Sequence, residues 1–338
     1  MPYDEYFKPN KSYVAVLIRL NRPMRFNVDT LYSTIVREFK SFPLLIAEPK
    51  YDGADVEVIK RGDRVKIYTE DGSLVTGRLP TIVEALRKIK KDFTCLGELE
   101  KYVEGRHRLR EEVSGYLHSR GRTDDKDFVI TLYDILYLNG KDVSKEFALR
   151  RVKLLYGLGI GQSALTPKPP LNVVPYLLCK TRASLQKAAA TYCPQKHFEG
   201  MVLKVANFGY WDKPYLIKFK KFMAVLAIVV RVYVNRGGSY NYDVALIPHP
   251  NADPREIRRI KDRKYQFFAK TYNTSIKCKV GDVVELRLFS AKLKKTEAGI
   301  VFHAYGPQVA ERKGMWKRPN TVREVIDACR YYGILHTD

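Results

Sequence analysis

Lys50 is the residue of this sequence whose type and surroundings most clearly allow chemistry. It opens the string Lys50-Tyr51-Asp52-Gly53, directly after the apolar run 44–47, which predicts a strand. A lysine amine attacks phosphorus only when it is neutral, and the ordinary pKa of lysine is about 10.4. We therefore expect nearby cations, a metal or burial to lower the pKa of Lys50. Asp52 would orient the amine or a metal, and Gly53 would allow a tight turn beside phosphates, although such a string also occurs in ordinary turns.

Charged residues at the ends of other apolar runs form a second candidate set, which comprises Glu98, Glu199, Lys204, Lys218 and Lys220. Lys218 and Lys220 alternate on a predicted strand and so face one side. Facing inward they would neutralise a phosphate and help to lower the pKa of Lys50, and facing outward they would form a solvated basic edge. Glu98 and Glu199 would be costly to bury unpaired, and each is otherwise a surface or ion-pair residue. Lys204 would contact phosphate or cap its strand.

Five short motifs follow one another along the chain, at residues 50–53, 96–99, 133–140, 199–204 and 216–220. Their residues and their order resemble the ATP-dependent DNA ligases, which belong to the covalent nucleotidyltransferase superfamily together with RNA ligases and mRNA capping enzymes. The resemblance covers about residues 44 to 325. The string YDILYLNGKDV, which begins at Tyr133, favours the DNA ligase branch.

The resemblance implies a three-step reaction. Lys50 attacks ATP, releases pyrophosphate and holds AMP as a phosphoramidate. AMP then passes to the 5′-phosphate at a break in duplex DNA, and the 3′-hydroxyl finally displaces AMP and seals the strand. Each step is an in-line attack at phosphorus, so positioning and charge neutralisation dominate catalysis. A Mg²⁺ or Mn²⁺ ion would be held by Glu98 and Glu199.

The resemblance also implies an ATP site. Tyr133 would stack on adenine, Glu48 would read the adenine amino group, and Glu98 would contact the ribose. The full set of nucleotide-binding residues that we expect beside the nucleophile is Glu48, Asp52, Gly53, Glu98, Tyr133, Glu199, Lys204, Lys218 and Lys220.

Three positions depart from the family pattern, because Asp55, Glu70 and Asp212 stand where members usually carry arginine. Those arginines bind ribose and phosphates, so an acidic residue there inverts the local charge. Nearby cations would have to compensate, and the candidates are Arg61, Arg64, Lys66, Arg78 and Lys213. The last family motif, a basic one, has two candidates, Arg312-Lys313 and Lys317-Arg318.

Composition points to a nucleic-acid partner. The 338 residues include 60 Lys plus Arg against 37 Asp plus Glu, a net charge of +23 that favours a polyanion. The five cysteines lie far apart without a Cys-x-x-Cys pair, which argues against zinc and disulfides. We expect a cytoplasmic monomer without a signal peptide or membrane span, since the longest apolar run, 222–230, is too short to cross a bilayer. Sparse glutamine and abundant charge favour a thermophilic source. No sliding-clamp or other protein partner can be assigned.

The predicted fold class is α+β. It consists of a nucleotidyltransferase (ATP-grasp-like adenylation) domain over residues 1–221, made of antiparallel sheets and helices, and an OB-fold β-barrel with a C-terminal helix over residues 222–338. No large N-terminal DNA-encircling domain is expected, so the basic C-terminal domain or a partner would grip the DNA. Individual patterns predict a helix capped by Asp29, a capping-box helix over 81–91, a loop over 167–175 and a basic helix over 253–263.

Two further functions stay open. One is an RNA ligase or a nick sealer of relaxed sugar specificity, because the usual phosphate-binding arginines are replaced. The other is a nucleic-acid-binding protein on a ligase fold whose catalysis has decayed, although an intact Lys50 argues against decay.

Overall fold

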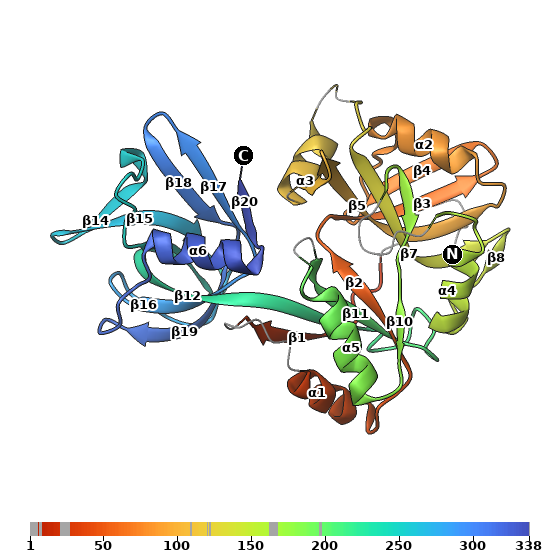
Figure 1. Cartoon of the computed structure of the whole chain (residues 1–338), viewed down its shortest axis with the longest axis horizontal. Helices are drawn as coiled ribbons and strands as arrows, with labels where there is room; N and C mark the ends of the chain where they lie inside the picture. The colour runs from red at the N-terminus through yellow and green to blue at the C-terminus, as the bar shows by residue number, and fades with distance from the viewer. Residues whose placement is uncertain are drawn as a thin grey trace. The chain divides into compact units, whose positions relative to one another are not determined.

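The structure is a computed structural model, and it describes residues 6, 9–20, 28–108, 110–119, 121, 123–161, 168–195 and 198–337. These residues divide into two compact units. The N-terminal unit lies within residues 1–16 and 26–220, and the C-terminal unit lies within 17–25 and 221–338. The strand β12 (Leu216–Val234) is where the chain passes from one unit into the other (Figure 1). Most strand pairs are antiparallel, which confirms the predicted α+β class.

The first sheet of the N-terminal unit has the order β10-β2-β11-β12. Its strands are β2 (Leu45–Tyr51), β10 (Leu177–Cys179), β11 (Phe198–Val205) and the beginning of β12, and β1 (Tyr13–Arg19) also pairs with β12. This sheet carries Lys50, Glu199, Lys218 and Lys220 on adjoining strands, so its register decides the geometry of the candidate site.

The second sheet has the order β4-β3-β5-β7-β8, with β6 against β5 and β9 parallel to β7. Its strands are β3 (Ala54–Arg61), β4 (Arg64–Thr69), β5 (Phe93–Val103), β6 (Arg106–His107), β7 (Phe128–Leu138), β8 (Lys141–Asp142) and β9 (Leu171–Val173). Asn139 and Gly140, both at positive φ, form the turn after β7. The predicted loop over 167–175 is wrong at β9, since three of its residues pair with β7.

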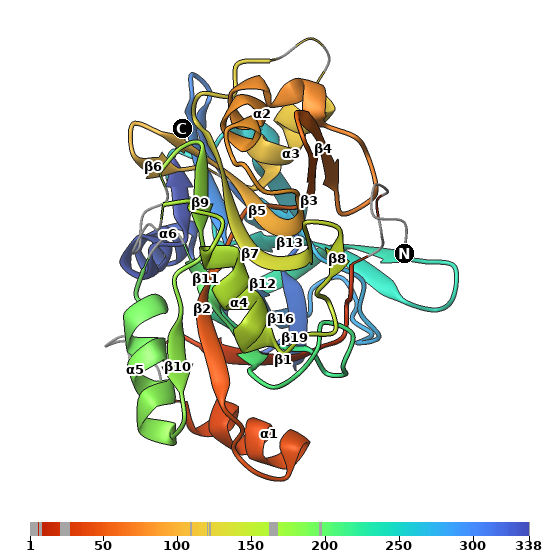
Figure 2. The ribbon, with the colours of Figure 1, turned by 90° about the vertical axis from the view of Figure 1, so that its right-hand side faces the viewer.

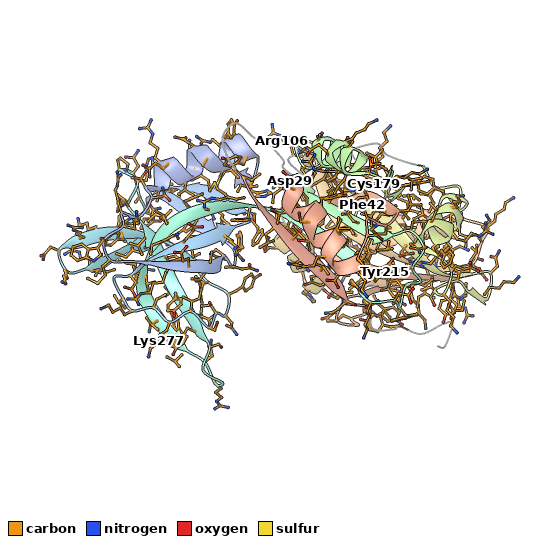
Figure 3. All side chains as sticks on the ribbon, turned by 90° about the horizontal axis from the view of Figure 1, so that it is seen from below. Asp29, Phe42, Arg106, Cys179, Tyr215 and Lys277 are labelled. Carbon is orange, nitrogen blue, oxygen red and sulfur yellow. The ribbon has the colours of Figure 1, made fainter. Side chains whose placement is uncertain are left out.

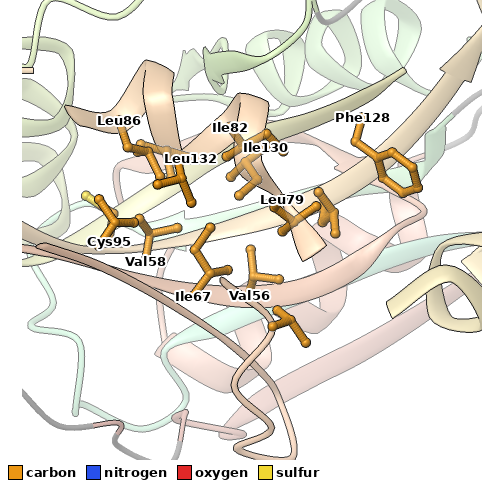
Figure 4. Packing of buried hydrophobic residues seen from close by; sticks show 14 of the residues in the cluster. Val56, Val58, Ile67, Leu79, Ile82, Leu86, Cys95, Phe128, Ile130 and Leu132 are labelled. Carbon is orange, nitrogen blue, oxygen red and sulfur yellow. The ribbon is translucent and has the colours of Figure 1, made fainter. Parts of the chain in front are cut away.

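Helices cover the sheets of the N-terminal unit. They are α1 (Asp29–Phe39), η1 (Thr76–Arg78), α2 (Pro80–Arg87), α3 (Arg110–His118), α4 (Ala148–Tyr156) and α5 (Arg182–Tyr192). The main core forms where α2 and α3 pack on β3, β5 and β7, with Val58, Ile82 and Leu132 among its buried members (Figure 4). Figure 2 shows α4 beside β7, against which it packs.

Two predicted helix caps are wrong. Asp29 is the first residue of α1 rather than its cap, and its carboxylate instead accepts hydrogen bonds from Arg182 of α5. α2 begins at Pro80, ends at Arg87 and has no capping box. Its first free N–H groups, those of Thr81 and Ile82, donate to the buried carboxylate of Asp125 at 3.1 Å each.

The C-terminal unit consists of antiparallel strands and one terminal helix. The second half of β12 pairs with β13 (Tyr240–Leu246) and β16 (Val283–Leu288), and β16 pairs with β19 (Gln308–Gly314). Further strands are β14 (Ile257–Ile260), β15 (Arg263–Lys270), β17 (Ala291–Thr296), β18 (Gly299–Ala304) and β20 (Leu335–Thr337). The helix α6 (Val322–Tyr332) is the predicted C-terminal helix, and it begins with a capping box of Thr321 and Glu324.

The predicted helix over 253–263 is wrong. The stretch forms a short 3-10 turn, η2 (Pro254–Glu256), and then the hairpin of β14 and β15. Ile257 and Ile260 have a helical spacing, and the turn between the strands holds Lys261 at a φ of 51° rather than a glycine or asparagine. The sequence therefore lacked the usual turn signal at this hairpin.

The five cysteines, Cys95, Cys179, Cys193, Cys278 and Cys329, are all free thiols and all buried. Among the described residues, no helix is long and apolar enough to cross a membrane.

Candidate nucleotide site and its relatives

The strands β2 and β11 exchange two lysine–glutamate pairs. β2 supplies Glu48 and Lys50, and β11 supplies Glu199 and Lys204. In the antiparallel register Lys50 lies opposite Gly200, where a β-bulge follows Phe198. Gly200 has a φ of 150°, and a Cβ there would lie 2.0 Å from the carbonyl oxygen of Phe219. A glycine is therefore required for β11 to lie this close to β12 and to present Glu199 beside Lys50.

Lys50 lies in a cluster of charges at one end of these strands. Its Nζ is 2.5 Å from Oε2 of Glu199, and Nζ of Lys220 is 3.2 Å from the same oxygen. Lys218 lies on the same face of β12, and its Nζ is 4.1 Å from the ring centre of Tyr13. Burial, together with the charges of Lys50 and Lys220, lowers the pKa of Lys218. The lysines of β12 thus face Lys50 rather than forming a solvated edge.

The prediction of a lowered pKa for Lys50 is wrong for the protein without its ligands. Burial alone would lower this pKa, but the carboxylates of Glu199 and Glu98 outweigh burial and raise it above the ordinary value. The charges of Lys50 and Lys220 in turn overcome the effect of burial on Glu199 and bring its pKa down to about 2. Lys50 is consequently held as an ammonium ion until something offsets these carboxylates.

Asp52 and Gly53 join this cluster to β5. The N–H of Gly53 donates to Oε1 of Glu98 at 2.8 Å. A Cβ at Gly53 would lie 2.2 Å from the carbonyl oxygen of Leu99, so only glycine fits against β5. Burial and the charge of Glu199 raise the pKa of Asp52 to about 7. Burial and the charge of Asp55 raise the pKa of Glu98 well above its usual range.

The second pair belongs to a buried network. Nζ of Lys204 is 2.8 Å from Oε1 of Glu48 and also donates to the carbonyl oxygen of Tyr133. Asp134 accepts hydrogen bonds from Arg151 and from the hydroxyl of Tyr215, which Figure 3 labels within the N-terminal unit. Burial raises the pKa of Glu48 to about 7 although Lys204 opposes this. Glu48 and Lys204 thus form an ion pair with each other. In the protein without nucleotide, this pair occupies the groups that were predicted to contact adenine and phosphate.

Two of the three acidic residues at the positions usual for arginine, Asp55 and Glu70, have cations beside them. Glu70 pairs with Lys11 at 2.7 Å, and both line a cavity of about 270 Å³ with Asp55 and Arg110. The carboxylates of Glu98, Asp55, Asp52 and Glu199 outweigh burial and raise the pKa of Arg110. Arg110 is therefore close to the charge cluster of Lys50.

One of the compensating cations expected from the sequence makes other contacts. Arg61 is buried and donates to the carbonyl oxygen of Phe93 and the hydroxyl of Thr94. Its guanidinium therefore links β3 to β5. Asp212 accepts from the N–H of Gly209 at 2.7 Å and thus stabilises a turn. Sequence reasoning missed Arg110 and Lys11, because neither lies near a motif, and only the chain's general basic surplus hinted at such residues.

His107 is a further residue that the sequence did not single out. Its Nε2 is 3.3 Å from Oε1 of the buried Glu100. Burial lowers the pKa of His107, but Glu100 and Asp52 outweigh burial and raise it. Glu100 and Asp52 thus favour the protonated form of His107.

The carboxylates of the cluster fit a magnesium ion in part. In the portion of the chain that the structure describes, no three His, Cys, Asp or Glu side chains are arranged to hold a metal. Mg²⁺ usually takes one or two carboxylates and completes its shell with water and phosphate oxygens. Glu98, Asp52 and Glu199 crowd negative charge together, as the raised pKa values of Glu98 and Asp52 show. A divalent cation shared with phosphates suits these oxygen ligands.

The two candidates for the C-terminal basic motif differ in their surroundings. Arg312 pairs with Asp282 at 2.8 Å, and Lys313 pairs with Glu311 at 2.5 Å. Lys317 and Arg318 are exposed, and Arg318 has one long contact with Glu324, at 3.9 Å. The second candidate therefore keeps its charge available.

Comparisons with known proteins identify the family of the chain. The family model for the ATP dependent DNA ligase domain matches residues 23–220. A probable DNA ligase of Opitutus terrae is 28% identical over 232 residues, which cover 58% of this chain and 22% of that protein. A DNA ligase of Methanococcoides burtonii is 29% identical over 141 residues, or 40% of this chain and 25% of that protein. The chain thus spans about a quarter or less of the length of these relatives.

Solved structures show the same fold. The structure of Pmar-Lig_PreS3 superposes with a TM-score of 0.57 at 15% identity, covering 89% of this chain and 67% of that one. A structure of a Lig E DNA ligase gives a TM-score of 0.53 at 15% identity, covering 80% and 92%. The fold is that of a nucleotidyltransferase unit followed by an OB-like barrel, as predicted. The chain belongs to the ATP-dependent DNA ligase family.

Proposed function

We propose that this chain seals breaks in duplex DNA with ATP, through covalent attachment of AMP to Lys50. The observation that carries the proposal is the cluster at the end of β2. One lysine amine lies 2.5 Å from Glu199, and two more lysines from β12 lie on the same face. Such a cluster can bind a triphosphate and can hold an amine for in-line attack at phosphorus.

The first step consumes the amine of Lys50. The ammonium must lose a proton, after which the nitrogen lone pair attacks the α-phosphorus of ATP. The N–P bond forms, the P–O bond to pyrophosphate breaks, and pyrophosphate leaves with the electron pair. Lys218 and Lys220 neutralise the phosphate charge. A divalent cation held by Glu199 and Glu98 would supply positive charge that favours the neutral amine.

The later steps return Lys50 to its free form. An oxygen of the 5′-phosphate attacks the phosphorus bound to Lys50, the N–P bond breaks, and the amine recovers its proton. The 3′-hydroxyl then attacks the 5′-phosphorus, AMP leaves, and the strand is closed. Arg110 and Lys11 supply cations for the incoming phosphate, in place of the arginines that Asp55 and Glu70 replace. The basic surplus of the chain supports binding of the DNA backbone.

The test is a chase. The protein is loaded with α-labelled ATP and Mg²⁺, freed of ATP, and mixed with nicked duplex DNA that bears a 5′-phosphate. We expect the label to form on Lys50, to move to the DNA and to appear as free AMP with sealing. Label that never forms would exclude catalysis and leave a binding protein. Label that forms and stays on the protein would exclude DNA as the acceptor, and nicked duplexes with RNA strands would be the next substrates.

A further inference from the structure

A groove in the C-terminal unit carries a tryptophan that is almost fully exposed. Trp316 is 98% exposed and Met315 is 57% exposed, both in the turn that follows β19. This tryptophan groove has a volume of about 470 Å³, and its lining includes Arg263, Lys264, Tyr265, Trp316, Lys317 and Arg318. It lies entirely within one unit and shares no residue with the cluster around Lys50.

The walls of the groove are apolar and its rim is basic. Tyr265 and Ile228 line it and belong to one small buried cluster. Arg263, Lys264, Lys317 and Arg318 are exposed, and no acidic residue lines the groove within the described part of the chain. The cavity near Arg110, in contrast, places Lys11 and Arg110 beside Asp55, Glu70 and Asp71. The tryptophan groove thus has a surplus of positive charge that its own residues leave uncompensated.

An indole this exposed gives the fold little stability. Burying a large aromatic side chain is among the strongest contributions to a core, and Trp316 makes none of this contribution. Aromatic faces bordered by arginine and lysine are the usual components of surfaces that stack nucleic-acid bases and pair with phosphates. The occupant that fits both features is therefore a polyanion with flat apolar rings.

We propose that the tryptophan groove binds unpaired nucleotides, with one base stacked on Trp316 and the neighbouring phosphates paired with the four cations. A base inside a duplex is already stacked on both faces, so only an unpaired one can lie against the indole. Tyr265, Ile228 and Met315 provide an apolar wall for the edge of that base. The site requires no catalysis, and it adds a single-strand contact to the proposed sealing reaction.

The test uses the intrinsic fluorescence of the full chain. The protein has two tryptophans, so Trp211→Phe leaves Trp316 as the single reporter. A single-stranded oligothymidylate of about twelve nucleotides covers one such site. We expect it to quench Trp316 in a saturable titration and to bind more tightly than a blunt duplex of the same length. In the wild-type background, Trp316→Ala should weaken its binding about ten- to a hundredfold.

A matched pair of variants separates the groove from the general basic surface. Arg263→Ala/Lys264→Ala removes two exposed charges at the groove, and Lys294→Ala/Lys295→Ala removes two exposed charges on β17. We expect the first variant to weaken oligothymidylate binding and to reduce its logarithmic salt slope by about 1.4. The second variant should bind like the parent protein.

Absence of quenching, equal binding of the duplex, or equal loss in the two double variants would each overturn the proposal. All variants should still form the covalent AMP adduct on Lys50. Failure of the groove proposal is therefore distinguishable from failure of the ligase proposal.

Discussion

The two lysine–glutamate pairs between β2 and β11 consist of the same residue types but differ in their exposure to solvent. Lys50 and Glu199 are 2.5 Å apart with 16% and 20% of their side chains exposed. Lys204 and Glu48 are 2.8 Å apart with 2% and 3% exposed. The first pair lies at the open end of the strands among further lysines, and the second is enclosed by Tyr133, Asp134 and the groups that bind them.

The difference in exposure suggests different functions for two ion pairs on the same two strands, one in catalysis and one in stability. A partly open ion pair can exchange its partners for a ligand, because water and other charges offset the loss. A fully buried pair cannot, because removing one partner leaves a charge without solvent or counter-charge. Lys50 is therefore suited to turnover, and Lys204 is suited to linking β2 and β11 to β7 of the other sheet. The predictions below test this division.

The largest effect is expected at the nucleophile. Lys50→Arg keeps the positive charge beside Glu199, but a guanidinium does not lose its proton and cannot attack phosphorus. We expect covalent labelling by α-labelled ATP to fall at least about a thousandfold. The free energy of unfolding should change by about 1 kcal/mol or less, since the ion pair remains. Labelling that persists in this variant would disprove the assignment of Lys50.

The buried pair should show the reverse pattern. Lys204→Met leaves Glu48 without its cation, and we expect the free energy of unfolding in urea to fall by about 3 kcal/mol. Lys153→Met, at an exposed position of α4, serves as the control and should change stability by about 0.5 kcal/mol at most. The double variant Glu48→Gln/Lys204→Met should recover part of the loss. A Lys204→Met protein as stable as the parent would show that the network gives no support.

A substitution of Arg110 tests whether α3 contributes a cation to the partly exposed cluster around Lys50. We expect Arg110→Ala to slow transfer of AMP to nicked DNA about ten- to a hundredfold, because a desolvated phosphate loses its cation. Stability should be unchanged, and Arg110→Lys should restore part of the rate. Arg106→Ala, at the exposed position on β6 that Figure 3 labels, is the matched control. Equal rates for the two alanine variants would remove Arg110 from the site.

The smallest effect concerns the proton of Lys50. The carboxylate of Glu199 stabilises the ammonium form, so Glu199→Gln should lower the pKa of Lys50. A shift of one unit makes the amine about tenfold more reactive at a given pH below its pKa. Acylation of Lys50 in the protein without nucleotide or metal, followed by mass spectrometry across pH, measures this shift. A profile that stays in place or moves to higher pH would contradict the assigned charge effect.

Local sequence patterns predicted the surroundings of Lys50 better than those of the buried Lys204. The apolar run 44–47 predicted the strand that leads to Lys50, and alternation placed Lys218 and Lys220 on one face. The role of Lys204 depends on Glu48 and Asp134, which are distant in sequence. They meet it only because β2 pairs with β11 and because β7, from the other sheet, packs nearby. The residues adjacent to Lys204 in the sequence do not indicate these partners. The alternation of Lys218 and Lys220, in contrast, can be read from a few consecutive residues.

Long-range contacts also explain the wrong helix start. The string of Thr81 to Glu84 has the letters of a capping box, but Asp125, which lies 44 residues beyond Thr81, already accepts the first N–H groups of α2. Arg110 could not be predicted as a site residue for a similar reason. Its position near the cluster around Lys50 depends on how α3 packs, and the sequence does not show this. The α+β class and the gathering of Lys218 and Lys220 beside Lys50 were predictable, and the cations that lie beside Asp55 and Glu70 were not.

The buried thiols have a consequence for following the protein in solution. Burial raises the pKa of Cys95 well above its usual range, that of Cys179 to about 11 and that of Cys329 to about 12. A thiolate-specific reagent should therefore modify these residues only after local opening. Cys95 and Cys179 belong to the N-terminal unit and Cys329 to the C-terminal unit. The kinetics of alkylation at each thiol would thus report the opening of each unit separately, within a single sample and without an added label.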